Sequence, residues 1–227
     1  FPIIAGISRW KINLFILKLI GKNKICIARG PLACELALKR GFKKVCYDGR
    51  AAVCAEIDEF QVVEGVKLIQ EFKEAENKSV LNSDYRIAVS DTLVKYWQDQ
   101  FNYKDENHII IPCTLATSFS SIDESEKSTA IKDKLHLADT DILFCFSGGN
   151  AGWNSLERTF SIFRPLLIEN VNFKLLLLTG EADYIKQFQN EFPNQVTRLW
   201  VNHDEVHNYL TVADYGLLIR EDRITNN

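Results

Sequence analysis

Methionine is absent from this 227-residue sequence, which begins at Phe1. A natural chain of this length usually contains several methionines, including the initiator, so we expect an excerpt of a longer polypeptide. The six cysteines form no Cys-x-x-Cys pair, and four of them lie inside apolar, strand-like stretches. We therefore expect reduced core thiols, as in a cytosolic protein.

Long apolar runs and an excess of positive charge are also absent. No apolar run approaches the roughly 18 residues that a membrane span requires, and no signal-peptide pattern is visible. The net charge of −3 and the pI of about 5.9 give no electrostatic footprint for nucleic acid. With 46% hydrophobic and 25% charged residues, the composition is that of a soluble globular protein. We expect a cytoplasmic protein with no nucleic-acid partner.

Apolar residues near the start of the chain recur at helical spacing among basic ones. The apolar set is Ile12, Phe15, Ile16, Leu19 and Ile20, and the basic set is Arg9, Lys11, Lys18, Lys22 and Lys24. This pattern predicts an ordinary helix that packs its apolar face on a sheet. A helix lying on a membrane surface is the alternative.

Short apolar stretches alternate with amphipathic stretches along the whole chain. The expected strands are 25–28, 45–47, 85–89, 108–111, 142–146, 173–178, 196–201 and 214–219. The expected helices are 9–22, 31–40, 56–76, 91–101, 154–169, 181–192 and 204–212. A polar stretch at 118–128 is the expected linker. The sequence therefore predicts an α/β fold with two Rossmann-like domains, residues 1–118 and 119–227, each a parallel sheet flanked by helices and incomplete at both ends.

A glycine-rich turn follows the first strand of the second domain. It reads Ser147-Gly148-Gly149-Asn150-Ala151-Gly152, and the N-cap types Asn154 and Ser155 come next. We expect Gly148 to be left-handed and the amides of residues 148–150 to converge on a phosphate beside a helix N-terminus. The turn matches neither dinucleotide nor P-loop motif in full, and a purely structural tight turn is the alternative.

Polar residues follow every expected strand, at the edge where open parallel sheets bind ligands. They are Arg29-Gly30, Asp48-Gly49-Arg50, Ser90-Asp91, Thr114, Ser147-Gly148-Gly149, Thr179-Gly180-Glu181, Asn202-His203 and Arg220-Glu221. Loop starts are polar in any case. We expect Asp48 to orient a ligand hydroxyl group and Arg50 to bind an anionic group. An ion pair that caps neighbouring loops is the alternative.

Several of these stretches together resemble the GT-B glycosyltransferases, and within them glycosyltransferase family 4. The matching stretches are ICIARG at 25–30, VCYDGR at 45–50, IAVSDTL at 87–93, IIIP at 109–112, FCFSGG at 144–149, LLLTG at 176–180, and VNHDEVHNYLTVADYGL at 201–217. The last is the most specific, and the order and spacing of all of them span nearly the whole chain.

The resemblance implies a retaining glycosyltransferase of the hexosyltransferase type. Such an enzyme moves a sugar from a nucleotide-diphosphate donor to a glycan or lipid-linked acceptor in bacterial surface polysaccharide synthesis, without a cofactor. His203 and His207 lack carboxylate or cysteine neighbours at ligand spacing, so we expect no metal site. The catalytic candidates are Asp48, expected to orient a donor or acceptor hydroxyl, and Arg50, expected to bind an anionic sugar or a lipid phosphate. The donor-binding candidates are Ser147, Gly148, Gly149, Asn150, Gly180, Arg220 and Glu221. A peripheral contact with the inner face of the membrane is a further expectation.

Two features depart from the family pattern. The Arg and Lys that commonly follow the glycine-rich turn are missing, so the cation for the diphosphate is expected from Arg158, Arg220 or Arg223. The usual histidine after the second matched strand is replaced by Asp48. A sugar-nucleotide epimerase or hydrolase and a non-catalytic nucleotide-binding relative are therefore alternatives. A dinucleotide-dependent oxidoreductase, with Glu181 on the ribose, is a weaker one.

Overall fold

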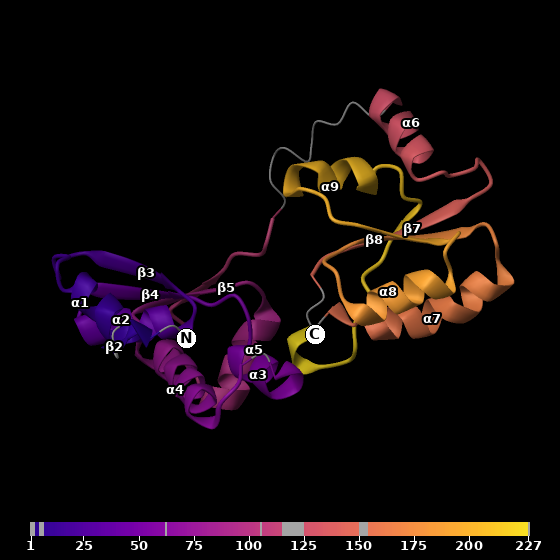
Figure 1. The fold of residues 1–227 in the computed structure, drawn as a ribbon. Helices are drawn as coiled ribbons and strands as arrows, with labels where there is room; N and C mark the ends of the chain where they lie inside the picture. Colours follow the sequence, from indigo (N-terminus) through magenta and orange to yellow (C-terminus); the bar gives the residue numbers. More distant parts are fainter. Residues whose placement is uncertain are drawn as a thin grey trace. The chain divides into compact units, whose positions relative to one another are not determined.

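The computed structural model of the chain describes residues 3–4, 7–61, 63–104, 106–114, 125–149 and 154–226. The chain divides into two compact units (Figure 1). Unit 1 consists of Phe1–Thr114 with Arg223–Thr225 and Asn227, and unit 2 consists of Leu115–Asp222 with Asn226. The domain boundary predicted between residues 118 and 119 lies outside the described residues.

Unit 1 contains a parallel four-stranded sheet in the order β3-β4-β5-β6. Its strands are β3 (Ile25–Arg29), β4 (Lys44–Asp48), β5 (Tyr85–Ala88) and β6 (His108–Ile110). Its helices are α1 (Arg9–Leu17), α2 (Pro31–Arg40), α3 (Val53–Phe60), α4 (Val66–Asn82) and α5 (Asp91–Phe101). The short strands β1 (Ile3–Ile4) and β2 (Ile7–Ser8) form a separate antiparallel pair. Strands and helices alternate from β3 onwards, which confirms the predicted α/β class.

Local signals fix the ends of α2 and α5 at the predicted residues. Helix α2 starts with a proline in its first turn and ends at Gly41, which is left-handed with φ 74°. Helix α5 is capped by Ser90, whose hydroxyl accepts a hydrogen bond from the Leu93 amide at 3.2 Å. The expected long helix at 56–76 is wrong, because α3 and α4 are separate. The chain turns between them at Gln61 and Gly65, with φ values of 49° and 93°.

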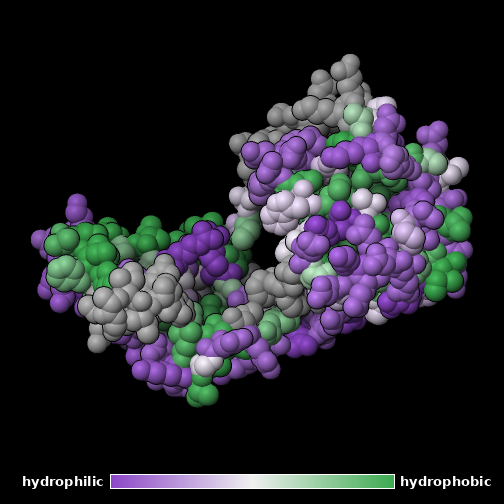
Figure 2. Space-filling view, in the orientation of Figure 1, coloured by the Kyte–Doolittle hydropathy of each residue, from purple (hydrophilic) through white to green (hydrophobic). Residues whose placement is uncertain are grey.

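The sheet of unit 1 buries one of its faces. Helices α2, α4 and α5 lie on that face (Figure 1), and the largest buried side chains there include Tyr47 and Trp97, both 0% exposed. The opposite face carries exposed apolar residues, among them Ile25, Ile27 and Ile109. Figure 2 shows hydrophobic surface over the β3 part of this unit.

The amphipathic face of α1 and the following turn does not pack on a sheet as expected. The side chains of Phe15, Ile16, Leu19 and Ile20 are exposed. The expectation of an ordinary packed helix is therefore wrong for these four residues. None of the helices in the described part of the chain is long and apolar enough to cross a membrane.

Unit 2 contains a second parallel sheet, in the order β10-β7-β8-β9. Its strands are β7 (Ile142–Ser147), β8 (Phe173–Leu178), β9 (Val196–Leu199) and β10 (Tyr215–Gly216). Its helices are α6 (Ser125–Lys134), α7 (Leu156–Glu169), α8 (Asp183–Glu191) and α9 (His203–Leu210). Helix α6 begins inside the stretch expected to be a linker, so that expectation is wrong from Ser125 onwards. The 3-10 turn η3 (Ile224–Asn226) follows the last strand.

Both faces of the unit 2 sheet are covered. Helices α7 and α8 lie on one face, and α6 and α9 lie on the other (Figure 1). Residues Leu175 to Leu178 of β8 are all buried and alternate between the two cores. Such a continuous apolar run is typical of a central strand in a doubly covered parallel sheet. This two-sided burial fixes the positions of the strand ends.

The six cysteines carry free thiols. Cys34 and Cys145 are buried as expected, whereas Cys113 is exposed. The expectation of core thiols is therefore wrong for Cys113.

Gly49 is required by the packing of Trp97. Its amide donates to the Ile87 carbonyl at 2.9 Å, and a Cβ built on it would lie 2.5 Å from Cζ2 of Trp97. We expect Gly49→Ala to destabilise the fold by about 1–3 kcal/mol, because the buried indole cannot move without disturbing the core. Urea unfolding measures the change. Gly21→Ala is the matched control, since no atom lies within 4 Å of its added Cβ, and equal stability of the two variants would contradict this reading.

Glu76 caps α3 from the neighbouring helix α4. It is 0% exposed, and its two carboxylate oxygens accept hydrogen bonds from the amides of Val53 and Cys54 at 2.9 and 2.7 Å. Burial raises the pKa of Glu76 above its ordinary value. We expect Glu76→Ala to lower stability by about 1–3 kcal/mol, because two buried amides lose their acceptors. The exposed Glu74 on the same helix is the control, and its alanine variant should unfold like the unmodified chain in thermal denaturation.

Candidate functional site

The carboxyl ends of β7, β8 and β9 form one edge of unit 2. The register pairs Ser147 with Leu178 and Leu178 with Leu199, so the three strands end level with one another. Ser147, Gly148 and Gly149 end or follow β7 at this edge, and Gly180 follows β8. The fold therefore brings these four predicted donor-binding residues together. Asn150 lies outside the described residues.

The glycine turn differs from the expected geometry in two respects. The Gly148 amide donates to the Leu178 carbonyl at 3.1 Å, so it extends the sheet and is not available to a ligand. Gly148 is also not left-handed: the glycines with positive φ in the described part of the chain are Gly30, Gly41 and Gly65. The absence of a side chain at Gly148 makes room for the Phe146 ring, because a Cβ added at Gly148 would lie only 3.2 Å from Cζ of Phe146.

The side chain of Asn154 holds the turn against the start of α7. Its amide nitrogen donates to the Gly149 carbonyl at 2.7 Å. A Cβ added at Gly149 would meet no atom of the described residues within 4 Å, so these residues leave the Gly149 side of the turn uncovered. This hydrogen bond holds the glycine-rich turn close to the first helical turn of α7, where backbone amides lack intrahelical acceptors.

Ser155 precedes α7 in an unusual conformation. It is left-handed, with φ 47°, and its hydroxyl makes no capping hydrogen bond. Ser155 therefore occupies the N-cap position as predicted, but its side chain does not cap the helix. Its carbonyl accepts the Thr159 amide, the first full helical bond. Among the described residues, the amides of Leu156, Glu157 and Arg158 therefore have no acceptor within the helix, and they lie at its positive end.

Two buried hydroxyls at this edge lack partners among the described residues: Ser155 Oγ and Thr179 Oγ1. Thr179 is 1% exposed and Ser155 is 7% exposed. A buried hydroxyl without a partner costs about 1–3 kcal/mol. Ordered water, an ion or a bound ligand can satisfy such a group. Unpartnered hydroxyls, a left-handed residue and free helix amides occur at one edge, and phosphate oxygens are the acceptors that such an edge fits.

The predicted cations lie in different places. Arg158 is exposed in the first turn of α7, and Arg220 and Glu221 lie past the carboxyl end of β10. Arg223 is held within unit 1, where its Nη1 donates to the Glu59 carbonyl at 3.1 Å and its guanidinium lies 5.1 Å from the Phe60 ring centre.

Asp48 and Arg50 lie together at the carboxyl end of β4 in unit 1. Oδ1 of Asp48 is 3.1 Å from Nε of Arg50, although the contact lacks the direction of a hydrogen bond. Nη1 of Arg50 also reaches Sγ of Cys113 at 3.8 Å, beyond β6. The two charges pair with each other, while the Arg50 side chain stays 39% exposed. Among the described residues, no group of three His, Cys, Asp or Glu side chains could hold a metal ion.

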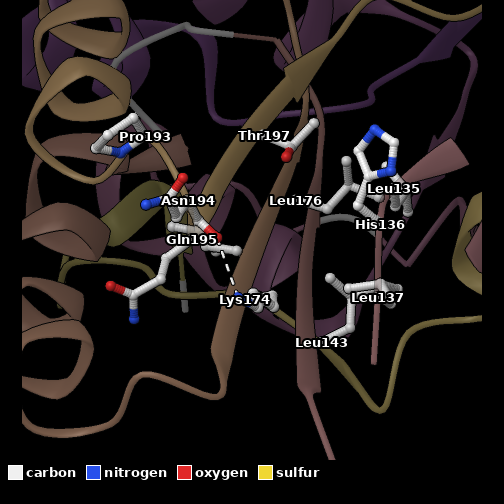
Figure 3. A pocket seen from close by; sticks show the side chains of 11 residues that line it. Leu135, His136, Leu137, Leu143, Lys174, Leu176, Pro193, Asn194, Gln195 and Thr197 are labelled. Atoms are coloured by element: carbon white, nitrogen blue, oxygen red, sulfur yellow. Dashed lines mark hydrogen bonds between the residues drawn. The ribbon is translucent and has the colours of Figure 1, made fainter. Parts of the chain in front are cut away.

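A cavity of about 310 Å³ lies at the opposite, amino end of the unit 2 sheet (Figure 3). Leu137, Leu143 and Leu176 form its apolar side, and Lys174 donates to the Asn194 carbonyl at 3.0 Å across it. Strand residues here are early in β7 and β8, far along the strands from the glycine turn. The cavity contains none of the predicted site residues.

Solved structures with similar folds are GT-B glycosyltransferases and related sugar-nucleotide proteins. The catalytic domain of starch synthase IV from Arabidopsis thaliana, bound to ADP and acarbose, matches 95% of this chain and 56% of its own, at 12% identity and TM-score 0.67. HepE from Anabaena in complex with UDP-glucose matches 91% and 55%, at 13% identity and TM-score 0.67. A glycosyltransferase from Rickettsia africae matches 91% and 54%, at 15% identity and TM-score 0.60.

These likenesses establish the fold class. The chain has the two Rossmann-like units of the GT-B fold, as predicted, and spans about half the length of the solved structures it matches. No family model matches the sequence, and no curated protein does. At 11–15% sequence identity, similarity to these structures establishes the fold alone. The function has to be argued from the residues of the site.

Replacing Ser155 tests whether its left-handed conformation costs folding free energy. We expect Ser155→Gly to raise the free energy of unfolding by roughly 1 kcal/mol, because glycine adopts the left-handed region without the cost that serine has. Ser155→Ala keeps the strain and serves as the matched variant. Chemical denaturation measures both, and a Ser155→Gly variant less stable than Ser155→Ala would contradict the argument.

Proposed function

We propose that this chain is part of a retaining glycosyltransferase, in which unit 2 binds the diphosphate of a nucleotide-sugar donor. The acceptor is a glycan or lipid-linked glycan of bacterial surface polysaccharide synthesis, and the enzyme acts in the cytoplasm at the inner face of the membrane. The donor and acceptor classes follow from the resemblance described above. Solved neighbours bound to ADP or UDP-glucose support the donor class.

One observation carries the proposal: the carboxyl edge of unit 2 is arranged for an anion. The first-turn amides of α7, the Gly149 backbone, and the hydroxyls of Ser155 and Thr179, which lack partners among the described residues, all belong to this edge. Phosphate oxygens accept hydrogen bonds from such groups, and the helix dipole favours the negative charge. A purely structural turn would leave the two hydroxyls without a role.

The chemistry needs such an arrangement. Cleaving a glycosyl–phosphate bond leaves negative charge on the departing diphosphate, and fixed hydrogen-bond donors stabilise that charge as it develops. The amides of α7 are fixed by the helix itself, and Asn154 fixes the turn beside them. Arg158 and Arg220 are the candidates for the neutralising cation, since Arg223 is held on α3.

Unit 1 supplies the candidate acceptor side. Asp48 and Arg50 form an ion pair at a strand end, with the arginine still partly open to solvent. Arg50 could thus contact an anionic group of the sugar or acceptor while Asp48 holds it in place. The basic residues Lys18, Lys22 and Lys24 beside exposed apolar side chains support the peripheral membrane contact.

The donor site can be tested with Gly148→Val. An added Cβ already lies 3.2 Å from Phe146 and 3.5 Å from Nδ2 of Asn154, so valine displaces the side chain that holds the turn. We expect affinity for UDP and ADP to fall on the order of tenfold or more, as when a fixed donor is lost. Isothermal titration calorimetry on the folded variant measures this.

Gly216→Val is the control for this experiment. Gly216 lies in β10 of the same sheet, and an added Cβ there meets no atom within 4 Å. Nucleoside diphosphate affinity should be unchanged in this variant. Unchanged affinity in a folded Gly148→Val variant would contradict the proposed donor site.

A further inference from the structure

Trp200 lies at the same edge of unit 2 and is largely exposed to solvent. It directly follows β9 and precedes Asn202, the N-cap of α9. Its side chain is 75% exposed, whereas Trp97 of unit 1 is fully buried. A large aromatic surface left in water is the property of a binding surface rather than of a core residue.

Gly180 leaves room beside the indole. The Thr179 amide donates to the Leu199 carbonyl at 3.2 Å, which continues the β8–β9 ladder to the position of Gly180 and Trp200. A Cβ placed on Gly180 would lie 3.9 Å from Cζ3 of Trp200. The absence of a side chain at Gly180 therefore leaves the approach to the ring from β8 clear.

The spacing along the edge fits a nucleoside diphosphate. The glycine turn follows β7 and Trp200 follows β9, with β8 between them. Neighbouring strands are about 4.8 Å apart, so roughly 10 Å separates the anion-binding end from the indole. A diphosphate bound at α7 would place its ribose over β8, near Gly180, and its base near β9.

We propose that Trp200 is the surface on which the base of the donor nucleotide stacks. This inference rests on the proposed donor site and specifies where the base of the nucleotide binds within it. The sugar carrier is a nucleotide with an aromatic base, since a lipid-linked phosphate has no ring to place on the indole. Stacking uses the face of any base, so the platform adds affinity for purine and pyrimidine nucleotides alike.

Calorimetry with UDP, ADP and inorganic pyrophosphate tests the inference on the full chain. Stacking on an aromatic side chain contributes about tenfold to a hundredfold in affinity. We expect Trp200→Ala to weaken UDP and ADP binding by that factor and to leave pyrophosphate binding unchanged. Trp200→Phe should retain most of the affinity, because a phenyl ring still stacks.

Val171→Ala is the matched control, since Val171 is 73% exposed at the amino edge of the same sheet. It should bind all three ligands like the unmodified chain. Thermal melting checks that each variant is folded. The unmodified chain gives a second measurement that depends on no variant: it should bind UDP at least about tenfold more tightly than pyrophosphate.

The outcomes separate the two proposals. Nucleoside diphosphates that bind no better than pyrophosphate, or equally well to Trp200→Ala, would overturn the role of Trp200 and leave the anion site standing. Failure of the unmodified chain to bind either UDP, ADP or pyrophosphate would overturn the donor site and the stacking surface together.

Discussion

Burial of β8 on both of its faces is the constraint on which unit 2 depends. The four consecutive leucines, Leu175 to Leu178, alternate between a core under α7 and α8 and a core under α6 and α9. Because neither face can shift without exposing leucine, the register with β7 and β9 is fixed. The strand ends are then level, and every loop that leaves them starts from the same edge.

That edge concentrates features that do not stabilise the fold. Ser155 is held in a left-handed conformation, and the hydroxyls of Ser155 and Thr179 are buried without partners among the described residues. Trp200, which directly follows β9, exposes most of its side chain at the same edge. Each feature costs free energy in the unliganded chain. Strained residues and unsatisfied polar groups of this kind cluster at ligand-binding sites.

Unit 1 has a parallel sheet in the sequential order β3-β4-β5-β6, whereas unit 2 places its last strand, β10, beside β7, and unit 1 lacks the second covering layer. Its helices bury Tyr47 and Trp97 on one face, while the other leaves Ile25 and Ile27 exposed. Parallel sheets normally have both faces covered. The polar interior of this unit is nevertheless well satisfied at α3, where Glu76 accepts both amides that begin the helix.

The sequence by itself determined the alternation of strands and helices, the bounds of α2 and α5, and the residues that reach the carboxyl edge, because periodicity and capping are local. Only the tertiary structure decided the rest. It divided the expected helix at 56–76 into two and gave the Gly148 amide to the sheet. It also buried the Thr179 hydroxyl without a partner among the described residues and left Trp200 exposed at the edge. Hydrogen-bond partners and exposure depend on which strands become neighbours, and no local pattern contains that information.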